Sequence, residues 1–338
     1  MSGRVLIIAE AGVNHNGSLE LALRLVDAAA EAGADAVKFQ SFKADKVASA
    51  QAAKADYQTR TTGAGESQLE MLRRLELTET DHQVIAARCL ERGIRFLSTP
   101  FDEESADLLH RLGVELFKIP SGEITNTPLL RHVASLGHPL VISTGMADLE
   151  EVRECVEVVR RAGATDITLL HCVTEYPAPV DQINLRAMAT MRSAFGLPVG
   201  YSDHSEGIEI ALAATALGAC VIEKHFTLDR NLPGPDHKAS LEPSELAAMV
   251  RGIRVVERAL GDGIKRAAPC ERANRDVARR SVVVLRDLPS GTVLADSDLG
   301  ARRPGTGITP SRIPELVGQI LSQPVEAGTL LRMEDLQS

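Results

Sequence analysis

The sequence predicts an α/β protein, a closed (β/α)8 TIM barrel followed by a small, mostly-β domain. Two observations predict this fold class. Short apolar runs alternate eight times with amphipathic helical patterns up to Gly261, and the pattern changes after that residue. Strands that alternate with helices form parallel βαβ units. Eight such units in roughly 260 residues fit a closed barrel better than an open sheet.

Each expected strand begins with apolar residues. The eight strands are expected at residues 5–10, 36–40, 95–99, 116–120, 140–143, 167–172, 199–202 and 221–225. The segments between them place apolar residues at i, i+3, i+4 and i+7, as in residues 19–33, which is typical of amphipathic helices. Residues 244–261 supply the eighth helix.

The chain is expected to contain three parts. Residues 1–262 form the barrel, residues 263–280 a polar linker with a short helix, and residues 281–338 the small domain. The last part has short apolar runs such as SVVVL and PVEAGTLL, separated by turn signals such as LPSGT and PGTG. A domain of this size builds little core of its own. We therefore expect it to dock on the barrel or on another subunit.

Composition and charge exclude several classes of protein. The net charge of -9 argues against a nucleic-acid or anionic-membrane partner, although a local cationic pocket can still bind an anionic substrate. No apolar run approaches the roughly 20 residues of a membrane helix. The N-terminal RVLIIAEAG is typical of a strand rather than a signal peptide. Five dispersed cysteines predict reduced thiols in a cytoplasmic protein.

The connection between the second and third strands, residues 41–80, is unusually long. Loops of that length are either functional or disordered. Its role is left open at this point.

Polar residues gather where the expected strands end. In a (β/α)8 barrel the active site lies at the C-terminal ends of the strands. One polar strand end would mean little, but eight in register predict a pocket. In chain order the polar strand-end residues are Glu10, Lys38, Gln40, Ser98, Thr99, Lys118, Ser121, Glu123, Ser143, Thr144, His171, Thr174, Tyr176, Ser202, Asp203, His204, Glu223 and His225.

Two histidines at adjacent strand ends favour a metal site. Residues two apart in a strand share a face, so His204 points the same way as Ser202, and His225 the same way as Glu223. Two imidazoles with nearby carboxylates suit a divalent transition metal that keeps open positions for substrate. The alternative is that either histidine is a hydrogen-bonded residue of the barrel rim.

Two lysines at strand ends indicate an anionic ligand. Lys38 and Lys118 predict a phosphate or carboxylate, because lysine is strongly hydrated and rarely buried without a counter-charge. The alternative is a salt bridge to Glu10 or Glu123. The hydroxyl donors that phosphate oxygens need are offered by Thr99, Ser121, Ser143 and Ser202. Together these residues predict a site for a small phosphorylated acid and a metal.

Each of two carboxylates, Glu10 and Asp236, has two possible roles. Glu10 could act as a general base or pair with Lys38. Asp236, in the loop sequence GPDH, could hold a substrate hydroxyl or cap a turn.

The order of the motifs resembles a known family. The motifs are AEAGVNHNGS, VKFQSFKADK, STPFD, KIPSGE, STGM, HCVTEYPAP, YSDHSEG, EKHFTLD, GPDH and RRPGTGI. Over nearly the whole chain they resemble the sialic acid synthase family, which includes bacterial N-acetylneuraminate and N,N'-diacetyllegionaminate synthases. RRPGTGI is similar to the C-terminal antifreeze-like (SAF) domain of these synthases.

The resemblance implies a transferase that condenses phosphoenolpyruvate with an N-acylated mannosamine-type sugar in its aldehyde form. Water is consumed, and a nine-carbon 2-keto acid and phosphate are released. It also implies a divalent metal bound by His204 and His225, usually Mn2+, with Mg2+ or Co2+ as alternatives. Finally, it implies a domain-swapped homodimer in which Arg303 of the SAF domain reaches the partner's active site.

The resemblance assigns roles to individual positions. Those that match phosphoenolpyruvate contacts are Lys38, Thr99, Lys118, Ser121, Ser143 and Ser202. Those that match residues around the sugar, the metal and the reacting centre are Glu10, Gln40, Glu123, Tyr176, Glu223 and Asp236. A carboxylate such as Glu10 or Glu123 would assist the proton transfers, and the resemblance does not say which one takes which proton.

One position departs from the pattern of some family members. The segment HCVTEYP places Thr174 where those members have an asparagine that contacts ligand, and threonine offers one hydroxyl in place of an amide. This variant resembles the branch with the sialate synthases of some enteric bacteria and the legionaminic acid synthases. The acceptor is therefore either N-acetylmannosamine or 2,4-diacetamido-2,4,6-trideoxymannose.

Two other functions remain as alternatives. A metal-dependent TIM-barrel aldolase or hydrolase would use His204 and His225 to activate water, without phosphoenolpyruvate and without a need for Lys38 and Lys118. An ice- or carbohydrate-binding domain on an inert barrel would keep its function after His204→Ala.

Overall fold

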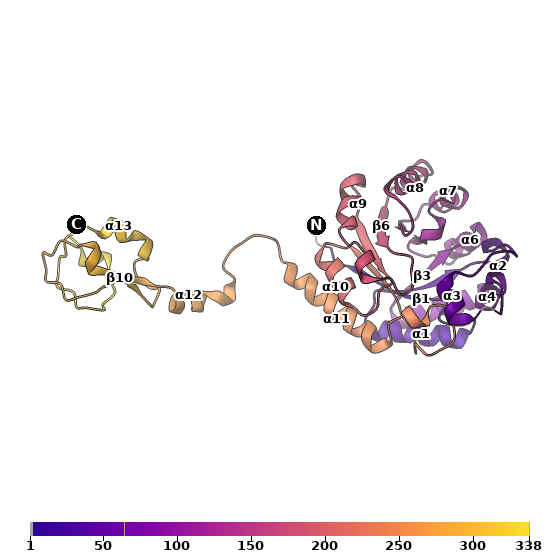
Figure 1. Cartoon of the computed structure of the whole chain (residues 1–338), viewed down its shortest axis with the longest axis horizontal. Coiled ribbons are helices and arrows are strands. Elements are labelled where there is room, and N and C mark those ends of the chain that lie inside the picture. The colour runs from indigo at the N-terminus through magenta and orange to yellow at the C-terminus, as the bar shows by residue number, and fades with distance from the viewer. Residues whose placement is uncertain (1–2, 64, 338) are drawn as a thin grey trace. The chain divides into compact units, whose positions relative to one another are not determined.

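The computed structural model of the chain describes residues 3–63 and 65–337. The chain divides into two compact units, Met1–Gly261 and Asp262–Ser338 (Figure 1). Within the described ranges, no helix is both long and apolar enough to cross a membrane. Each unit is described by itself below.

The first unit is built on eight parallel strands. They are β1 (Leu6–Gly12), β2 (Ala36–Ser41), β3 (Arg95–Pro100), β4 (Phe117–Ile119), β5 (Leu140–Ser143), β6 (Ile167–Cys172), β7 (Val199–Asp203) and β8 (Val221–His225). They pair in the order β3-β2-β1-β8-β7-β6-β5-β4, and the two end strands, β3 and β4, lie against each other. The sheet therefore closes, and the predicted (β/α)8 barrel is confirmed.

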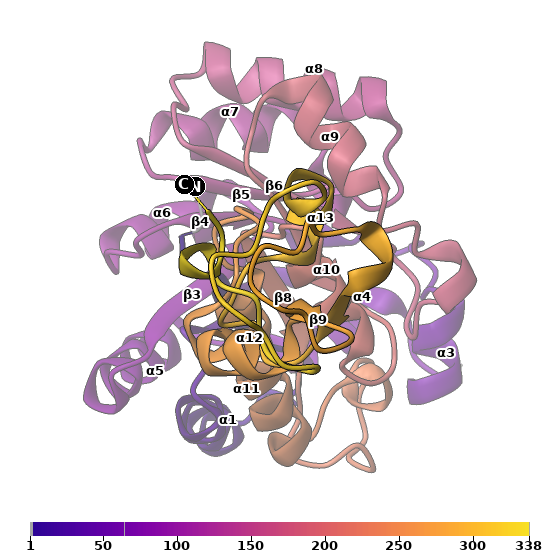
Figure 2. The same ribbon diagram turned by 90° about the vertical axis from the view of Figure 1, so that its left-hand side faces the viewer.

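Helices surround these strands (Figure 2). They are α1 (Leu19–Ala32), α5 (Glu79–Arg92), α6 (Glu103–Arg111), α7 (Thr127–Ser135), α8 (Leu149–Arg161), α9 (Ala187–Phe195), α10 (Glu209–Ala216) and α11 (Pro243–Leu260). Helix α1 shows how the sequence sets their ends. The Ser18 hydroxyl accepts a hydrogen bond from the Leu21 N–H, and Gly33 ends the helix in the left-handed conformation (φ 81°).

The interior of the barrel has an apolar layer below the strand ends. It is formed by Ile8, Ala36, Leu97, Leu116, Val141, Leu170 and Val221. Side chains alternate between the two faces of a strand, so the residue two positions later points into the same interior. Two positions after Ile8, Ala36 and Leu116 come Glu10, Lys38 and Lys118. The apolar layer thus closes the barrel below a layer of polar side chains.

The register of the strands aligns these polar residues at one height. Glu10 is the neighbour of Lys38 on β2 and of His225 on β8. Ser202 on β7 is the neighbour of Glu223 on β8. A second, larger apolar cluster, which includes Ile7 and Ile222, packs the outer face of the sheet against the helices.

The long connection after β2 is folded. It contains the short helices α2 (Ala44–Val47), α3 (Asp56–Thr62) and α4 (Gln68–Leu75). Phe42, Met71 and Leu75 from this connection pack with Val13, from the loop after β1, into a separate apolar cluster. The described residues of this segment, 41–63 and 65–80, are therefore an ordered part of the barrel unit.

The second unit combines a short helix with a small antiparallel sheet. Helix α12 (Arg272–Ala278) precedes β9 (Ser281–Val284), which pairs antiparallel with β10 (Leu299–Arg302), and α13 (Ile313–Leu316) follows. Isolated bridges such as Leu288↔Val325 extend the β structure. Its own apolar cluster includes Val282 and Leu316, so this unit holds more core than its length predicted.

Candidate active site

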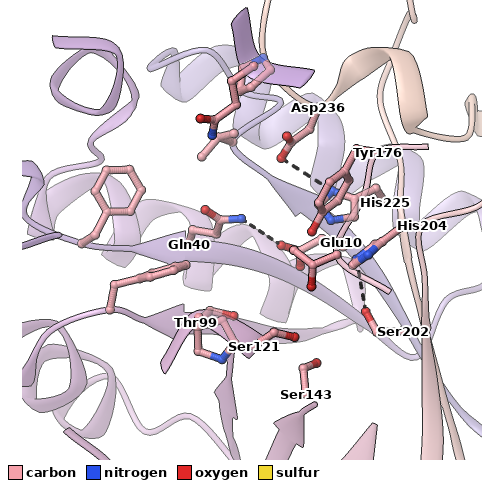
Figure 3. Close-up of a pocket in the computed structure, with 18 of the residues that line it drawn as sticks. Glu10, Gln40, Thr99, Ser121, Ser143, Tyr176, Ser202, His204, His225 and Asp236 are labelled. Atoms are coloured by element: carbon pink, nitrogen blue, oxygen red, sulfur yellow. Dashed lines mark hydrogen bonds and ion pairs between the residues drawn. The ribbon is translucent and has the colours of Figure 1, made fainter. Parts of the chain in front are cut away.

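A cavity of about 350 Å³ lies at the C-terminal ends of the barrel strands (Figure 3). Among the candidate residues, those that line it are Glu10, Lys38, Gln40, Thr99, Lys118, Ser121, Ser143, Thr174, Tyr176, Ser202, His204, Glu223, His225 and Asp236. Two candidates, Glu123 and Arg303, are not among its lining residues. The pocket expected at the strand ends is thus present in the structure.

We use the name polar floor for Glu10, Lys38, Lys118, Ser202 and Glu223, the buried side chains at the base of this cavity. Glu223 Oε1 accepts hydrogen bonds from Lys118 Nζ (2.9 Å) and Ser202 Oγ (2.9 Å). Lys38 Nζ lies 2.5 Å from Glu10 Oε2 and 3.7 Å from Glu223 Oε2. Two ammonium groups and two carboxylates thus share one water-poor volume, where their interactions are strong.

The surroundings of the two carboxylates in the polar floor shift their pKa values in opposite directions. Burial raises the pKa of Glu10 to about 7, the charge of Glu223 adds to the rise, and Lys38 opposes it. Burial would also raise the pKa of Glu223, but the charges of Lys118 and Lys38 hold it well below its usual range. Glu223 therefore stays ionised, whereas Glu10 can gain or lose a proton near neutral pH.

The salt bridge that was the alternative interpretation of the two lysines is present between Lys38 and Glu10. An anion can still bind, because Lys118 keeps donors for it. Lys38 Nζ also donates to Thr99 Oγ1 (2.8 Å). Of the three donors on the Lys118 ammonium, one is used by Glu223 within the described chain, and the others can serve a ligand. The Glu123 carboxylate pairs elsewhere: its Oε2 accepts a hydrogen bond from Asn126 Nδ2 (2.6 Å).

Hydroxyl groups line the side of the cavity next to β4 and β5 (Figure 3). Ser121 Oγ accepts a hydrogen bond from the Gly145 N–H (2.9 Å). Ser143 Oγ and Thr174 Oγ1 are buried and have no hydrogen-bond partner among the residues that the structure describes. A Cβ atom on Gly145 would lie 2.2 Å from Thr174 Oγ1, so only glycine fits there. Buried polar groups without partners are costly, and a polar ligand would satisfy them.

Two imidazoles face the cavity from β7 and β8 (Figure 3). The rings of His204 and His225 lie 5.4 Å apart, centroid to centroid. His204 Nδ1 donates to the Val173 carbonyl (2.6 Å), so Nε2 carries the lone pair, with Ser202 Oγ 3.5 Å away. Burial lowers the pKa of His204 to about 4 and that of His225 well below its ordinary value. Both rings are therefore neutral, the form that binds metals.

The donor set fits a divalent transition metal only with help from substrate or water. Across the described ranges, no three or more His, Cys, Asp and Glu side chains are grouped so that they could hold an ion. Two imidazole nitrogens are a partial ligand set, and His225 Nδ1 is buried without a hydrogen-bond partner in the described structure. A metal held by two side chains keeps open positions for a ligand.

Tyr176 and Asp236 close the cavity above the imidazoles. The Tyr176 ring stacks on His204 with centroids 4.2 Å apart and lies 4.8 Å from the ring of Tyr57 on α3. Asp236 Oδ2 lies 3.8 Å from His225 Nδ1, and burial raises the pKa of Asp236 to about 6. The GPDH loop thus brings a carboxyl group over the imidazole pair.

The apolar side of the cavity was not foreseen from the sequence. We use the name apolar wall for Val13, Phe42, Met71, Leu72 and Leu75, which line the cavity. All but Val13 come from the 41–80 connection. The apolar spacing of QLEMLRRL in α4 could have revealed an amphipathic helix, but spacing alone does not say whether its apolar side meets a core or a ligand.

Arg303 lies in the second unit. Its side chain is exposed there, and Nε donates a hydrogen bond to the Ala278 carbonyl (3.0 Å). Glu123 ends the 3-10 helix Ser121–Glu123 and is half-buried. The structure therefore assembles the other candidates in one cavity of the first unit, whereas Glu123 does not line that cavity in the described chain and Arg303 belongs to the second unit.

A (β/α)8 barrel with buried lysines, free hydroxyls and paired neutral imidazoles at its strand ends defines an enzyme with a site for a small anion. The particular family follows from sequence comparison. The chain belongs to the NeuB family, whose profile matches residues 25–265, and residues 279–337 match the SAF domain. The predicted family is thereby confirmed.

Similar proteins support this assignment. The chain is 52% identical to the N,N'-diacetyllegionaminic acid synthase of Campylobacter jejuni, with 97% of this chain and 99% of that one covered. It is 50% identical to the N,N'-diacetyllegionaminic acid synthase of Legionella pneumophila, covering 98% and 94%. The structure also resembles the N-acetylneuraminic acid synthetase of Leptospira borgpetersenii, solved with citrate (TM-score 0.71, 37% identity, 80% and 90% covered).

Proposed function

We propose that the protein is a nonulosonic acid synthase. It condenses phosphoenolpyruvate with an N-acylated mannosamine-type aldehyde sugar and water, and it releases a nine-carbon 2-keto acid and phosphate. The observation that carries this proposal is that one cavity holds the two lysines of the polar floor, several hydroxyls and a pair of neutral imidazoles. The names of relatives 50% and 52% identical over nearly the full length support it.

The lysines and hydroxyls hold phosphoenolpyruvate. Lys38 and Lys118 neutralise its carboxylate and phosphate charges in a volume where water is scarce, so each interaction is stronger than in solution. The hydroxyls of Thr99, Ser121, Ser143 and Ser202 donate hydrogen bonds to its oxygens. Because these groups sit on separate strands of a rigid barrel, they fix the enol carbon toward the sugar aldehyde.

His204 and His225 would hold a divalent metal, which we propose to be Mn2+, with Mg2+ or Co2+ as alternatives. When bound, such an ion supplies Lewis acidity for the aldehyde oxygen. The chain's own contribution is the orientation of the two rings: Val173 fixes that of His204, and Asp236 lies next to that of His225. Tyr176 packs against His204 and limits the entry of water.

Glu10 is the group we assign to proton transfer. Water that adds to the neighbouring carbon, which bears the phosphate oxygen and becomes cationic when the enol carbon attacks, must give up a proton, and a carboxylate with a pKa near neutrality can accept it and later return it. Glu123, the other carboxylate considered, does not line the cavity in the described chain. Glu223 stays ionised between the lysines, and Asp236 holds a sugar hydroxyl. Gln40 and Thr174 complete the sugar contacts.

The apolar wall favours the trideoxy sugar as acceptor. 2,4-Diacetamido-2,4,6-trideoxymannose carries a methyl group at C6 and a second acetamido methyl, whereas N-acetylmannosamine carries hydroxyls at both places. Apolar groups gain free energy when apolar side chains remove them from water. Met71, Leu72 and Leu75 offer such a surface on one side of the cavity. We therefore propose N,N'-diacetyllegionaminate as the product.

The remaining parts of the proposal concern assembly and location. We propose the division into a synthase barrel (1–262), a linker (263–280) and a SAF domain (281–338). We further propose a domain-swapped homodimer in which Arg303 serves the partner's site, and the exposed position of Arg303 in its own unit supports this. All five cysteines are free thiols, which supports the cytoplasm as location.

Phosphate release from phosphoenolpyruvate tests the function. The purified chain is incubated with Mn2+ and either N-acetylmannosamine or its 2,4-diacetamido-trideoxy relative. We expect release that requires sugar and stops with a chelator, and faster turnover of the trideoxy sugar. Release with neither sugar would return the chemistry to a metal-dependent aldolase or hydrolase. Activity retained by His204→Ala would overturn the role of the imidazole pair.

A further inference from the structure

A buried ion pair lies behind the two imidazoles, on the outer face of the same strands. Lys224 is 0% exposed, and Nζ donates to Asp203 Oδ2 (2.8 Å) and to the Ser205 carbonyl (2.5 Å). Asp203 is 1% exposed and Ser205 0%. None of these three residues lines the cavity within the described part of the chain, and the proposed reaction does not use them.

The positions of the pair follow from strand alternation. On β8, Lys224 stands between Glu223 and His225, which face the cavity, so its side chain faces the helices. At the end of β7, Asp203 lies between Ser202 and His204, which also face the cavity, so its side chain faces the helices as well. The two residues are direct neighbours across the strands. The ion pair therefore ties β7 to β8 at the positions that carry the imidazoles (Figure 3 shows the cavity side).

The same contacts fix the chain on both sides of His204. Asp203 Oδ1 accepts hydrogen bonds from the Ser205 N–H (3.0 Å) and hydroxyl (2.6 Å), while Lys224 binds the Ser205 carbonyl. The His204 carbonyl itself accepts from the Ala178 N–H (2.9 Å). The backbone of residues 203–205 thus has almost no freedom to move, and the direction of the His204 side chain is set by that backbone.

Stability alone does not account for a charged pair at this place. A buried ion pair costs nearly as much to desolvate as it returns, and apolar residues of similar size often stabilise a protein as well or better. Two residues earlier on each strand, Tyr201 and Ile222 face the same way as the ion pair, and both belong to the large apolar cluster. A salt bridge has what apolar packing lacks, a fixed direction and distance between two named atoms.

We propose that Lys224 and Asp203 are positioning residues for the metal site. The pair locks the ends of β7 and β8 so that His204 and His225 keep the separation and direction that a divalent ion requires. This inference rests on the proposed function, because it assumes that the two imidazoles are metal ligands. Groups behind metal ligands typically change metal affinity by about 10- to 100-fold when they are removed.

The test measures Mn2+ affinity directly. Titration of the full-length chain, followed by the electron paramagnetic resonance signal of free Mn2+, gives the dissociation constant without any turnover. The variants are K224M and the neutral pair D203L/K224M, and melting temperatures are recorded with chelator. We expect the dissociation constant to rise at least about tenfold in both variants. The neutral pair leaves no unpaired buried charge, although Ser205 loses its hydrogen bonds to Asp203, so its melting temperature is expected to fall less than that of K224M.

A matched control lies at the opposite end of the barrel. Arg254 Nη2 binds Asp35 Oδ2 (2.5 Å), which also accepts a hydrogen bond from the Ile7 N–H (2.8 Å) at the amino-terminal ends of the strands. R254M also breaks an ion pair, here a partly buried one, but far along the strands from the imidazoles. We expect it to lower the melting temperature and leave the Mn2+ dissociation constant unchanged.

The outcomes separate this inference from the proposed function. If the wild-type chain binds Mn2+ and D203L/K224M binds it equally well, the positioning role is wrong while the metal site stands. If both K224M and D203L/K224M fail to fold, the pair serves stability, and the inference is again overturned. Failure of the wild-type chain to bind Mn2+ would overturn the metal site together with this inference.

Discussion

The polar floor and the apolar wall of the cavity are built from different kinds of structure. The floor consists of charged and hydroxyl side chains at the ends of barrel strands, held within 2.5–3.7 Å of one another. The wall consists mostly of Phe42, Met71, Leu72 and Leu75, from a connection with three short helices. One side of the site is therefore set by the register of a closed sheet and the other by a segment outside it.

The difference teaches how one barrel can keep a reaction and change its substrate. The strands that carry the floor are paired on both sides, so a shift of one residue would turn every site residue outward. A connecting segment tolerates substitution, because it packs in its own small cluster. On the proposed function, the floor performs the phosphoenolpyruvate chemistry and the wall selects the sugar.

The largest expected effect comes from breaking the floor. In K118M the ammonium that binds Glu223 is lost, and a buried carboxylate remains with fewer partners. Loss of one preorganised active-site donor typically lowers the rate about a hundred- to a thousandfold, so we expect a fall of that size in kcat/KM for phosphoenolpyruvate. Phosphate-release kinetics measure it. K46M removes an exposed lysine that pairs with Glu104 and should leave kcat/KM unchanged. A K118M enzyme within threefold of wild type would contradict the role of the floor.

The strands and the polar floor could be predicted from the sequence better than the apolar wall could. The strands were located within two residues, because short apolar runs ending in polar residues have a clear period. The floor followed from the same period: Lys38 must share a face with Ala36. Glu123 was placed in the site as a polar residue at the end of the fourth expected strand. It lies beyond β4 in a 3-10 helix, where strand alternation no longer sets the direction of a side chain, and it bonds to Asn126 instead.

The wall could not be predicted for a physical reason. Met71 and Leu72 show the spacing of an amphipathic helix, and that spacing is the same whether a helix covers a core or a ligand. The stacking of Tyr176 on His204 and the Lys224–Asp203 pair depend on contacts between distant segments, which no local pattern encodes. Strand period thus revealed the chemistry, while the residues that shape and support it required the fold.

An intermediate effect is expected at His15, a buried residue outside the polar floor. His15 follows β1, is 0% exposed, and burial lowers its pKa from 6.5 to about 4, with the charge of His82 adding to the decrease. The folded state therefore favours neutral His15. Its contribution to stability is complete above pH 6.5 and is lost as the pH falls toward 4. Between pH 7.5 and pH 5 this group alone should remove about 2 kcal/mol of unfolding free energy.

Urea unfolding of the metal-free chain at these two pH values checks the effect of His15. H15N keeps an oxygen that can accept the Gly17 N–H hydrogen bond that His15 Nδ1 accepts, and it cannot titrate. We expect H15N to lose about 2 kcal/mol less than wild type on acidification. H110N, at an exposed histidine of α6, is the matched control and should follow wild type. Equal acid sensitivity of H15N and wild type would show that His15 does not limit stability.

The smallest effect is expected at the apolar wall. It tests most directly whether the wall and the polar floor have separate roles. Leu72 is half-buried on α4 and lines the cavity, so L72Q changes the surface offered to the sugar without emptying a core position. Loss of one apolar contact costs about 1–2 kcal/mol for a substrate methyl group. We therefore expect kcat/KM for the trideoxy sugar to fall about tenfold, with little change for N-acetylmannosamine or in the KM for phosphoenolpyruvate.

The ratio of the two sugar specificities is the informative quantity for L72Q, since a general loss of fold or chemistry lowers both values together. L90Q, at a leucine of α5 that is 84% exposed, should leave the ratio unchanged. A ratio that stays constant in L72Q while both sugars are turned over would place sugar selection elsewhere in the cavity. A ratio that shifts toward N-acetylmannosamine would mean that floor and wall can be changed independently, because the chemistry would survive a change in preference.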